Sequence, residues 1–407
     1  MPEPYFFFRP ILAADQSWAA LDWQSGTHFT NDCTDLERCF TEAGAAPLAR
    51  LLPMVVPINP ECIEQAAFVA GFDASHSQFV FVLPAATLGN TQTLARCKQL
   101  RSQGNRFGLH IDRNDLLRQV PVAAFDFLWL DATFARQNLP TIDLIYAHDA
   151  GFRKIATKVG SHEMFGWLTA KKFEWCNNHF LTVRNPLAGP EPDLTRLKLL
   201  KLLNLVRQDG DTREIEGIFR EEPKLSYNLL RLVNSVAVGA RTRISNFSQA
   251  IAQLGRRQLQ RWLQLLIYAD NLDNGNAPNP LMQLAAARGR LMELLITAIE
   301  PEPDLPDLSD NAFMTGLFSL LDVLINLPMK EILKELPLQP EVADALNSPA
   351  DDGILGRLLS AIIAGESGNF SDAEAILSGL GIGPATHAKS QVTALYWAAR
   401  INIENQN

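Results

Sequence analysis

Histidine and cysteine are scarce in this 407-residue chain, and both are missing from most of its second half. None of the seven histidines lies between positions 180 and 386, and Cys176 is the last of five cysteines. Helical phosphohydrolases that depend on metals hold them with converging His and Asp side chains. We therefore expect no catalytic metal centre between these positions.

The sequence also lacks signs of export or of a membrane segment. An odd number of cysteines argues against a disulfide framework and fits a reducing cytoplasm. The start of the chain has no basic region and only a short apolar run, so it does not resemble a signal peptide. No stretch reaches the roughly 18 uninterrupted apolar residues that a membrane span requires. We expect a cytoplasmic protein without membrane contact.

Positive charge exceeds negative charge in only one segment. Residues 1–190 have a net charge of −2, residues 191–270 of +4 and residues 271–407 of −11. A nucleic-acid binder usually has a larger basic excess, so nucleic-acid binding is not expected. The middle segment holds a basic cluster that is either a solvated helix face or a surface for an acidic partner or a phosphate-bearing ligand. Its members are Arg231, Arg241, Arg243, Arg256, Arg257, Arg261 and Trp262.

Short apolar runs alternate with amphipathic stretches in the first half, a pattern typical of βα units. So many repeats favour a compact TIM-like (β/α) barrel over an open sheet. The expected strands are Phe6–Leu12, Trp18–Gln24, Met54–Asn59, Phe79–Leu83, Arg106–Ile111, Phe127–Asp131, Ile142–Tyr146, Ile155–Val159 and Phe180–Val183.

The second half is predicted to be entirely helical. A stretch rich in proline at 185–196 marks a linker, and no strand-like alternation follows it. The predicted organisation is a barrel at 1–187, a linker at 188–196 and a helical bundle at 197–407. Residues 281–299 and 311–327 are among the expected helices.

Polar residues end several of the expected strands, where the catalytic groups of a barrel belong. They are Asp22, Gln24, Asn59, His110, Asp112, Asp131 and Thr157. Four of them, Asp22, Asn59, Asp112 and Asp131, carry oxygen ligands that could in principle hold Mg²⁺ or Ca²⁺.

Several short motifs within 197–268 resemble the HDOD domain, a helical relative of HD phosphohydrolases that has lost their metal-binding His and Asp residues. The motifs are Glu222–Ser226, Leu229–Ser235, Arg243–Ser245 and Gln249–Gly255. The absence of histidine from this region agrees with the resemblance independently. The implied fold is an HDOD-type bundle with a helical extension.

Residues 5–187 resemble the EAL domain, the barrel of cyclic di-GMP phosphodiesterases. The stretches that carry the resemblance are Arg9–Ile11, Ala20–Gln24, Ile58–Pro60, Gly104–Asp112, Leu128–Asp131 and Ala156–Ser161. The resemblance implies a barrel with a two-metal site at the ends of its strands.

The chain departs from the EAL pattern at most of the implied site positions. Ala20 replaces the glutamate that names the family, Gln24 replaces a phosphate-binding arginine, and Trp129 replaces the catalytic lysine. Two paired aspartates fall on His110 and Ile111, and two later glutamates fall on Thr157 and Gly160; only Asn59 and Asp131 remain. Two-metal hydrolysis needs these ligands, so the resemblance implies a degenerate, non-catalytic barrel.

The expected function is a non-catalytic bacterial signal-transduction scaffold or regulator that needs no metal or cofactor. Its expected partner is a signalling protein such as a sensor kinase, a response regulator or a cyclase module. One alternative is a cyclic di-GMP receptor that binds through Arg9, Asn59 and Lys158, although Gln24 disfavours nucleotide binding. Another is a weak metal-dependent phosphodiesterase that uses Asp22, Asn59 and Asp131.

Overall fold

The chain divides into two compact units, each described here by itself. The computed structural model describes residues 3–26, 33–65, 78–184, 199, 203, 260–261, 263–267, 280–301, 303, 307–335, 338–349 and 353–401. Unit 1 comprises Met1–Val183 and Ala361–Val392, and unit 2 comprises Arg184–Ser360 and Thr393–Asn407. The predicted linker lies outside the described residues.

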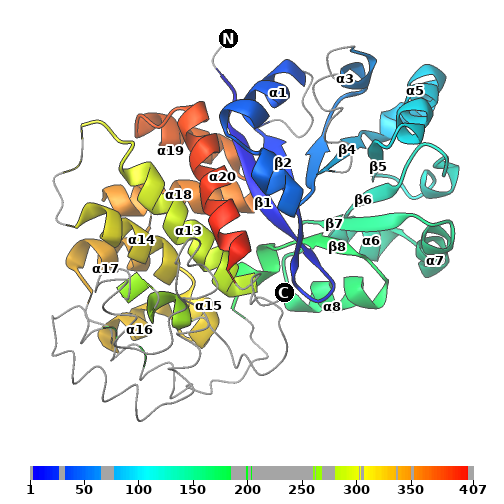
Figure 1. Ribbon diagram of the computed structural model, residues 1–407. Coiled ribbons are helices and arrows are strands. Elements are labelled where there is room, and N and C mark those ends of the chain that lie inside the picture. Colours follow the sequence, from blue (N-terminus) through cyan, green and yellow to red (C-terminus); the bar gives the residue numbers. More distant parts are fainter. Residues whose placement is uncertain are drawn as a thin grey trace, which may run out of the picture. The chain divides into compact units, whose positions relative to one another are not determined.

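Unit 1 is built on a closed barrel of eight strands in sequence order, which confirms the predicted fold class (Figure 1). Strands β2 to β8 are parallel to their neighbours, whereas β1 runs antiparallel to both β2 and β8. The strands are β1 (Phe6–Ala13), β2 (Trp18–Ser25), β3 (Met54–Pro57), β4 (Phe79–Leu83), β5 (Arg106–Ile111), β6 (Phe127–Asp131), β7 (Arg153–Thr157) and β8 (Trp175–Asn177).

Helices follow most of the strands, and side-chain caps fix where several of them begin. The side chain of Asn90 accepts hydrogen bonds from the first turn of α5, and Asp131 and Ser161 do the same for α6 and α8. The α-helices are α1 (Cys33–Glu42), α2 (Ala46–Leu51), α3 (Pro60–Glu64), α5 (Thr91–Ser102), α6 (Ala132–Asn138), α7 (Thr141–Asp149) and α8 (His162–Ala170). Short 3₁₀ turns are η2 (Ala85–Gly89), η3 (Leu117–Gln119) and η4 (His179–Thr182).

Alternation along the strands divides the apolar residues between two layers. One set fills the barrel interior: Ile11, Ala20, Val55, Val80, Val82, Phe127, Trp129 and Ile155, with Trp175 packed against it. The alternate residues form a second layer, in which the ring of Trp23 stacks on Phe8 and approaches Phe79. Because side chains fill its interior, a ligand site on the barrel has to lie at one of its ends.

Two of the predicted strands are wrong, and one strand was missed. Residues 142–146 lie in α7, where Leu144 is buried while Ile142 and Ile145 are exposed. In a strand Ile142 and Leu144 would share one face, yet only Leu144 is buried, which is typical of a helix. The sequence had favoured a strand because its isoleucines are β-branched. Residues 180–182 lie in η4 instead of a strand. The eighth strand, Trp175–Asn177, is only three residues long and carries no alternating pattern.

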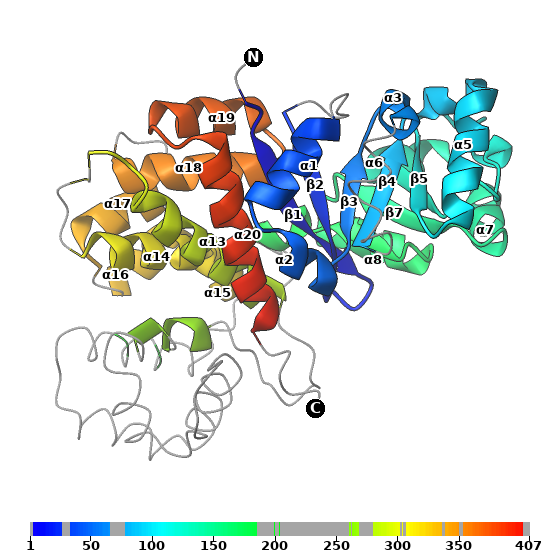
Figure 2. The same ribbon diagram turned by 45° about the horizontal axis from the view of Figure 1, so that its top comes forward.

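Residues 361–392 of the C-terminal helices belong to unit 1, although the sequence assigned them to the helical half. They come from α18 (Ile354–Ser367), α19 (Phe370–Gly379) and α20 (Pro384–Arg400). We call residues 361–392 the C-terminal cap. Figure 2 shows α20 alongside β1. The glycine-rich residues 380–383 form the loop between α19 and α20.

The cap completes the hydrogen bonding of β1. Strand β8 pairs with β1 only over Ile11–Ala13, so the earlier part of β1 has no neighbouring strand on that side. Gln391 of α20 takes its place: its Nε2 donates to the Phe6 carbonyl (2.9 Å) and its Oε1 accepts from the Phe8 amide (3.1 Å). Phe7 stacks on Phe370 with ring centroids 4.7 Å apart. The cap therefore closes an incomplete side of the barrel.

A buried histidine in the cap makes the stability of unit 1 sensitive to acid. His387 packs against the rings of Tyr5 and Phe7, and burial lowers its pKa to about 3. Gln391 Nε2 lies 3.1 Å from its Nδ1, which fits donation to a neutral ring. In the unfolded chain this histidine has an ordinary pKa near 6.5. The folded state therefore has its full stability above pH 6.5 and loses stability as the pH falls toward 3, because only the unfolded chain binds the proton in that range.

We therefore expect the free energy of unfolding to fall by about 1 kcal/mol through His387 between pH 6.5 and 5.5. Urea titrations at the two pH values test this expectation. The variant His387→Gln should lose this part of the pH dependence. An unchanged pH dependence in the variant would contradict the assignment.

All regular elements among the described residues of unit 2 are helices. Its helices include α13 (Pro280–Ile296), α14 (Leu308–Phe318), α15 (Leu321–Ile325), α16 (Met329–Glu335) and α17 (Pro340–Asn347). The predicted helix at 311–327 is divided into α14 and α15. The Ser319 hydroxyl donates to the Gly316 carbonyl (2.6 Å) and accepts from Arg288 (2.6 Å), and such side-chain bonds compete with continuation of a helix.

One segment of the described residues, Leu308–Ile325, is apolar enough to cross a membrane by length and composition. Its mean hydropathy is 1.3, and 61% of it is buried inside the structure. A core helix of a soluble protein has the same properties, so the segment is weak evidence for a membrane span.

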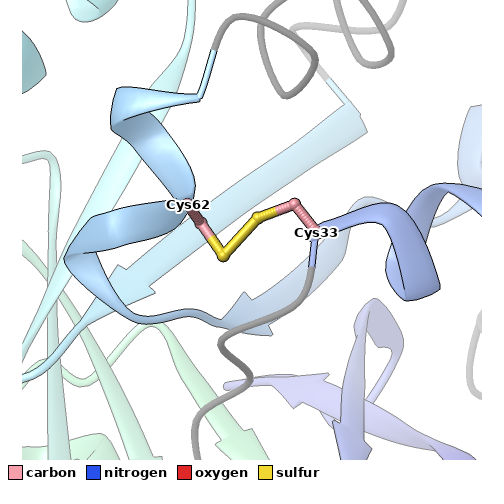
Figure 3. Close-up of a disulfide and its surroundings, with 2 residues drawn as sticks. All are labelled: Cys33 and Cys62. Atoms are coloured by element: carbon pink, nitrogen blue, oxygen red, sulfur yellow. A yellow bond between two sulfur atoms is a disulfide. The ribbon is translucent and has the colours of Figure 1, made fainter.

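A disulfide corrects the expectation that the cysteines remain unlinked. Cys33 at the start of α1 is bonded to Cys62 in α3, with Cα atoms 5.7 Å apart (Figure 3). The two helices follow the neighbouring strands β2 and β3, which the cysteine spacing alone did not reveal. Burial raises the pKa of Cys39, Cys97 and Cys176 to about 12, so these thiols stay protonated at neutral pH.

Candidate functional site

The polar strand ends gather at one end of the barrel, which we call the mouth. Because β2 to β8 are parallel, their carboxyl ends share one side. The antiparallel β1 brings its amino-terminal half to the same side, where Arg9 pairs with Asp22 and Phe7 with Gln24. The mouth is therefore the place to look for a site.

A cavity of about 380 Å³ lies at the mouth. Gln24, Trp129 and Thr157 line it, as do Arg9 and Lys158 from the receptor alternative. The sequence did not indicate the other lining residues, which are Gly26, Asn177, His179, Ser367, Gly368 and Phe370. Asn59, His110, Ile111, Asp131, Gly160 and Ala20 are not among the residues that line it.

Asp22 is engaged in a buried polar network. Arg9 Nη2 donates to its Oδ2, and Gln24 Nε2 donates to both carboxylate oxygens at 2.9 and 3.1 Å. Asp22 is 2% exposed, and the Arg9 guanidinium lies 5.2 Å from the centre of the Phe370 ring. The carboxylate thus serves to hold Arg9 and Gln24 in place, which competes with the predicted role of metal ligand.

Asp131 is also committed to neighbours within the chain. Its Oδ1 accepts the backbone amides of Thr133 (2.8 Å) and Phe134 (3.0 Å), and its Oδ2 lies 3.1 Å from Lys158 Nζ. Burial raises the pKa of Asp131, but these hydrogen bonds and the Lys158 ammonium outweigh that effect and hold it below the ordinary value. The carboxylate is therefore ionised at neutral pH and caps α6.

Two of the positions implied by the EAL resemblance lie in the barrel core. Ala20 and Trp129 are 0% and 1% exposed and belong to the same interior cluster. Ile111 is 0% exposed, and its neighbour His110 pairs in register with Trp129. Adjacent residues on a strand point to opposite faces, so His110 shares the inner face with Trp129 and Ile111 points outward. The apolar side chains of Ala20, Trp129 and Ile111 cannot coordinate a metal.

The remaining implied positions carry no charged side chain that could bind a ligand. Thr157 donates its hydroxyl to the Leu130 carbonyl (3.3 Å). Gly160 is exposed, and Asn59 precedes α3 without capping it through its side chain. Within the ranges that the structure describes, no group of three or more His, Cys, Asp or Glu residues is arranged to hold a metal ion.

Arg261 is the only member of the predicted basic cluster within the described residues. Its guanidinium pairs with Glu293 and with Asp310 (3.0 Å), and it lies 5.0 Å from the centre of the Phe313 ring. Two carboxylates already neutralise it, so it does not present a surplus positive charge to a partner. Arg231, Arg241, Arg243, Arg256, Arg257 and Trp262 lie outside the described residues, as do the quoted HDOD motifs.

Comparison with known proteins identifies a known domain in the helical half. The family model of the HDOD domain matches residues 192–338. An HDOD domain is present in this chain. The match begins within the predicted linker and ends before α17.

Two curated relatives resemble the chain at low identity. The uncharacterised protein YuxH of Bacillus subtilis is 25% identical over 269 residues, which cover 64% of each chain. The cyclic di-GMP phosphodiesterase CdgJ of Vibrio cholerae is 27% identical over 254 residues, which cover 61% of this chain and 56% of the relative. The chain spans about three fifths of the length of these relatives. It is thus related to HDOD proteins and to a cyclic di-GMP phosphodiesterase.

Solved structures of EAL proteins are similar to part of the chain. The EAL enzyme Bd1971 in its cAMP-bound form matches with a TM-score of 0.35 and 14% identity over 44% of this chain and 62% of the enzyme. The EAL-like domain protein YdiV matches with a TM-score of 0.34 and 12% identity over 43% of this chain and 90% of its own.

Proposed function

We propose that this chain is a non-catalytic signal-transduction protein that acts through protein contacts. The observation that carries the proposal is the composition of the barrel interior. The EAL resemblance implies a metal-binding glutamate and a catalytic lysine. Ala20 and Trp129 stand at these two positions, and both are packed into one apolar cluster. A side chain buried in a packed core cannot be exchanged for a charged group without disrupting its neighbours.

The carboxylates that remain at the mouth support the same proposal. Metal-dependent hydrolysis needs ligands whose oxygens converge on the ion and a base that activates water. Asp22 is held by Arg9 and Gln24, and Asp131 caps α6 and pairs with Lys158. A phosphodiesterase that used them would first have to break these interactions.

We expect the full chain to hydrolyse no cyclic di-GMP with Mg²⁺ or Mn²⁺, in an assay that follows the linear dinucleotide by chromatography. An active EAL phosphodiesterase run in parallel shows that the assay works. Turnover that survives repurification and disappears in the variant Asp131→Asn would contradict the proposal, because contaminating enzyme would be unaffected by that substitution.

The proposed partner is a signalling protein such as a sensor kinase, a response regulator or a cyclase module. Two findings support a role in signalling: an HDOD domain within the chain, and a relative named as a cyclic di-GMP phosphodiesterase. The basic cluster offers a direct test. We expect a tagged full chain to capture a partner that the variant Arg256→Glu/Arg257→Glu loses and the exposed control Lys98→Glu retains. Recovery of nothing above background would count against the proposal.

A cyclic di-GMP receptor is the second candidate, because Arg9 and Lys158 both line the mouth cavity. The third suspected contact, Asn59, does not. Isothermal titration with cyclic di-GMP, with and without Mg²⁺, separates the two functions. A saturating isotherm would favour the receptor, whereas a flat trace is expected for the scaffold.

A further inference from the structure

The mouth cavity is walled on one side by the chain's own C-terminal cap. Ser367, Gly368 and Phe370 come from the turn between α18 and α19 and line the cavity together with barrel residues. Gly368 has φ +86°, and a Cβ at this position would lie 2.9 Å from Arg9 Nη1. The positive φ favours glycine at this position, and the turn lies close to the Arg9 guanidinium.

The ionisable side chains that line the cavity are all basic, and two of them, Arg9 and Lys158, are each paired with a carboxylate. Arg9, Lys158 and His179 line it, and none of its described lining residues carries a carboxylate. The side chain of Arg9 is only 11% exposed, and its Nε is buried without a hydrogen-bond partner among the described residues. Because Nε itself is buried, an acceptor supplied by a ligand would bond to the outer nitrogens of the guanidinium.

Lys158 can contribute a second cation. Its side chain is 80% exposed, and its ion pair with Asp131 is of the surface kind that contributes little to stability. Its backbone lies in the left-handed region, with φ +54°, at the carboxyl end of β7. An anion in the cavity would compete with Asp131 for this ammonium.

Two aromatic rings complete the lining. Trp129 comes from the barrel interior and Phe370 from the cap. Aromatic side chains bind planar rings through their faces and edges. The volume of about 380 Å³ lies near the lower end of the range for small-molecule sites, roughly 300 to 1,000 Å³.

We propose that this cavity binds a compact phosphomonoester that carries one aromatic ring. Its phosphoryl oxygens accept hydrogen bonds from Arg9 and Lys158, as guanidinium and ammonium groups favour. Its ring lies beside Trp129 and Phe370. A cyclic dinucleotide has two bases and two phosphodiesters, whereas the cavity offers one guanidinium, one ammonium and the rings of Trp129 and Phe370. The ligand touches barrel and cap together, so its binding stabilises the cap.

The test uses isothermal titration of the full chain with GMP and phenyl phosphate, and with guanosine, inorganic phosphate and cyclic di-GMP for comparison. We expect GMP and phenyl phosphate to bind, phosphate alone to bind at least tenfold more weakly, and guanosine and cyclic di-GMP to give no heat. Lys158→Gln should weaken GMP binding about tenfold or more, as the loss of a charged hydrogen bond does. Phe370→Leu should weaken it as well.

The exposed control Lys98→Gln should leave GMP binding unchanged, and melting temperatures show whether each variant is folded. Hydrogen exchange of the α18–α19 turn should slow when GMP is added. Absence of binding by both phosphomonoesters at millimolar concentration would overturn the proposal. So would equal binding of phosphate and GMP, binding of cyclic di-GMP in place of GMP, or indifference to Lys158→Gln and Phe370→Leu. The hydrolysis and capture experiments test the proposed function separately.

Discussion

The variant Gln391→Leu is expected to lose about 4 kcal/mol of unfolding free energy. Leucine has a similar volume but cannot bond the Phe6 carbonyl or the Phe8 amide, both of which pair with Gln391. Each buried backbone group left without a partner costs roughly 1 to 3 kcal/mol. The measurement is urea unfolding combined with hydrogen exchange at the Phe8 amide, which should lose its protection.

The matched control is Gln103→Leu, the same substitution at an exposed position that follows α5. It should change the unfolding free energy by no more than about 0.5 kcal/mol. If both variants were equally stable, Gln391 would not complete the hydrogen bonding of β1. The conservative variant Gln391→Glu would not serve as a control, because it buries a charge.

The second large effect is expected for Gly316→Ala, which should destabilise unit 2 by about 3 kcal/mol. Helices α13 and α14 cross at two glycines. A Cβ on Gly316 would lie 2.7 Å from the Arg288 carbonyl oxygen and 2.7 Å from the Gly289 Cα. These are backbone atoms, so the helices themselves would have to separate. Hydrogen exchange of the α13 and α14 amides measures the effect locally.

Gly353→Ala provides the control within the same unit. A Cβ at Gly353 meets nothing within 4 Å, and its backbone is not left-handed, so alanine should be neutral or slightly stabilising. Comparable exchange rates in Gly316→Ala and the parent chain would contradict the close crossing.

The barrel could be predicted because its strands are apolar on both faces. Strands β4 and β6 read as continuous runs, FVFVL and FLWLD, which is typical of parallel strands buried on both sides. Strand β8 could not be found, since only its central Cys176 is fully buried. The error in α7 arose because its exposed isoleucines mimic a strand.

Only the site residues that lie at the ends of strands could be predicted from the sequence. Gln24 and Thr157 follow from their positions at the ends of β2 and β7. Phe370 could not be placed there, because more than 350 residues separate it from Arg9, and no local pattern indicates which surface a helix covers. Asp22 and Asp131 had the chemistry of metal ligands, but their actual partners depend on three-dimensional contacts.

The distance along the chain between β1 and Gln391 has a consequence for synthesis. Phe8 and Gln391 are 383 residues apart. At roughly 5 to 20 residues per second, a ribosome needs on the order of 20 to 80 s to make that interval. During this time the open edge of the first strand has no Gln391 to pair with, and unpaired strand edges invite aggregation. Strand β1 therefore acquires its last hydrogen-bond partner only after this whole interval has been made.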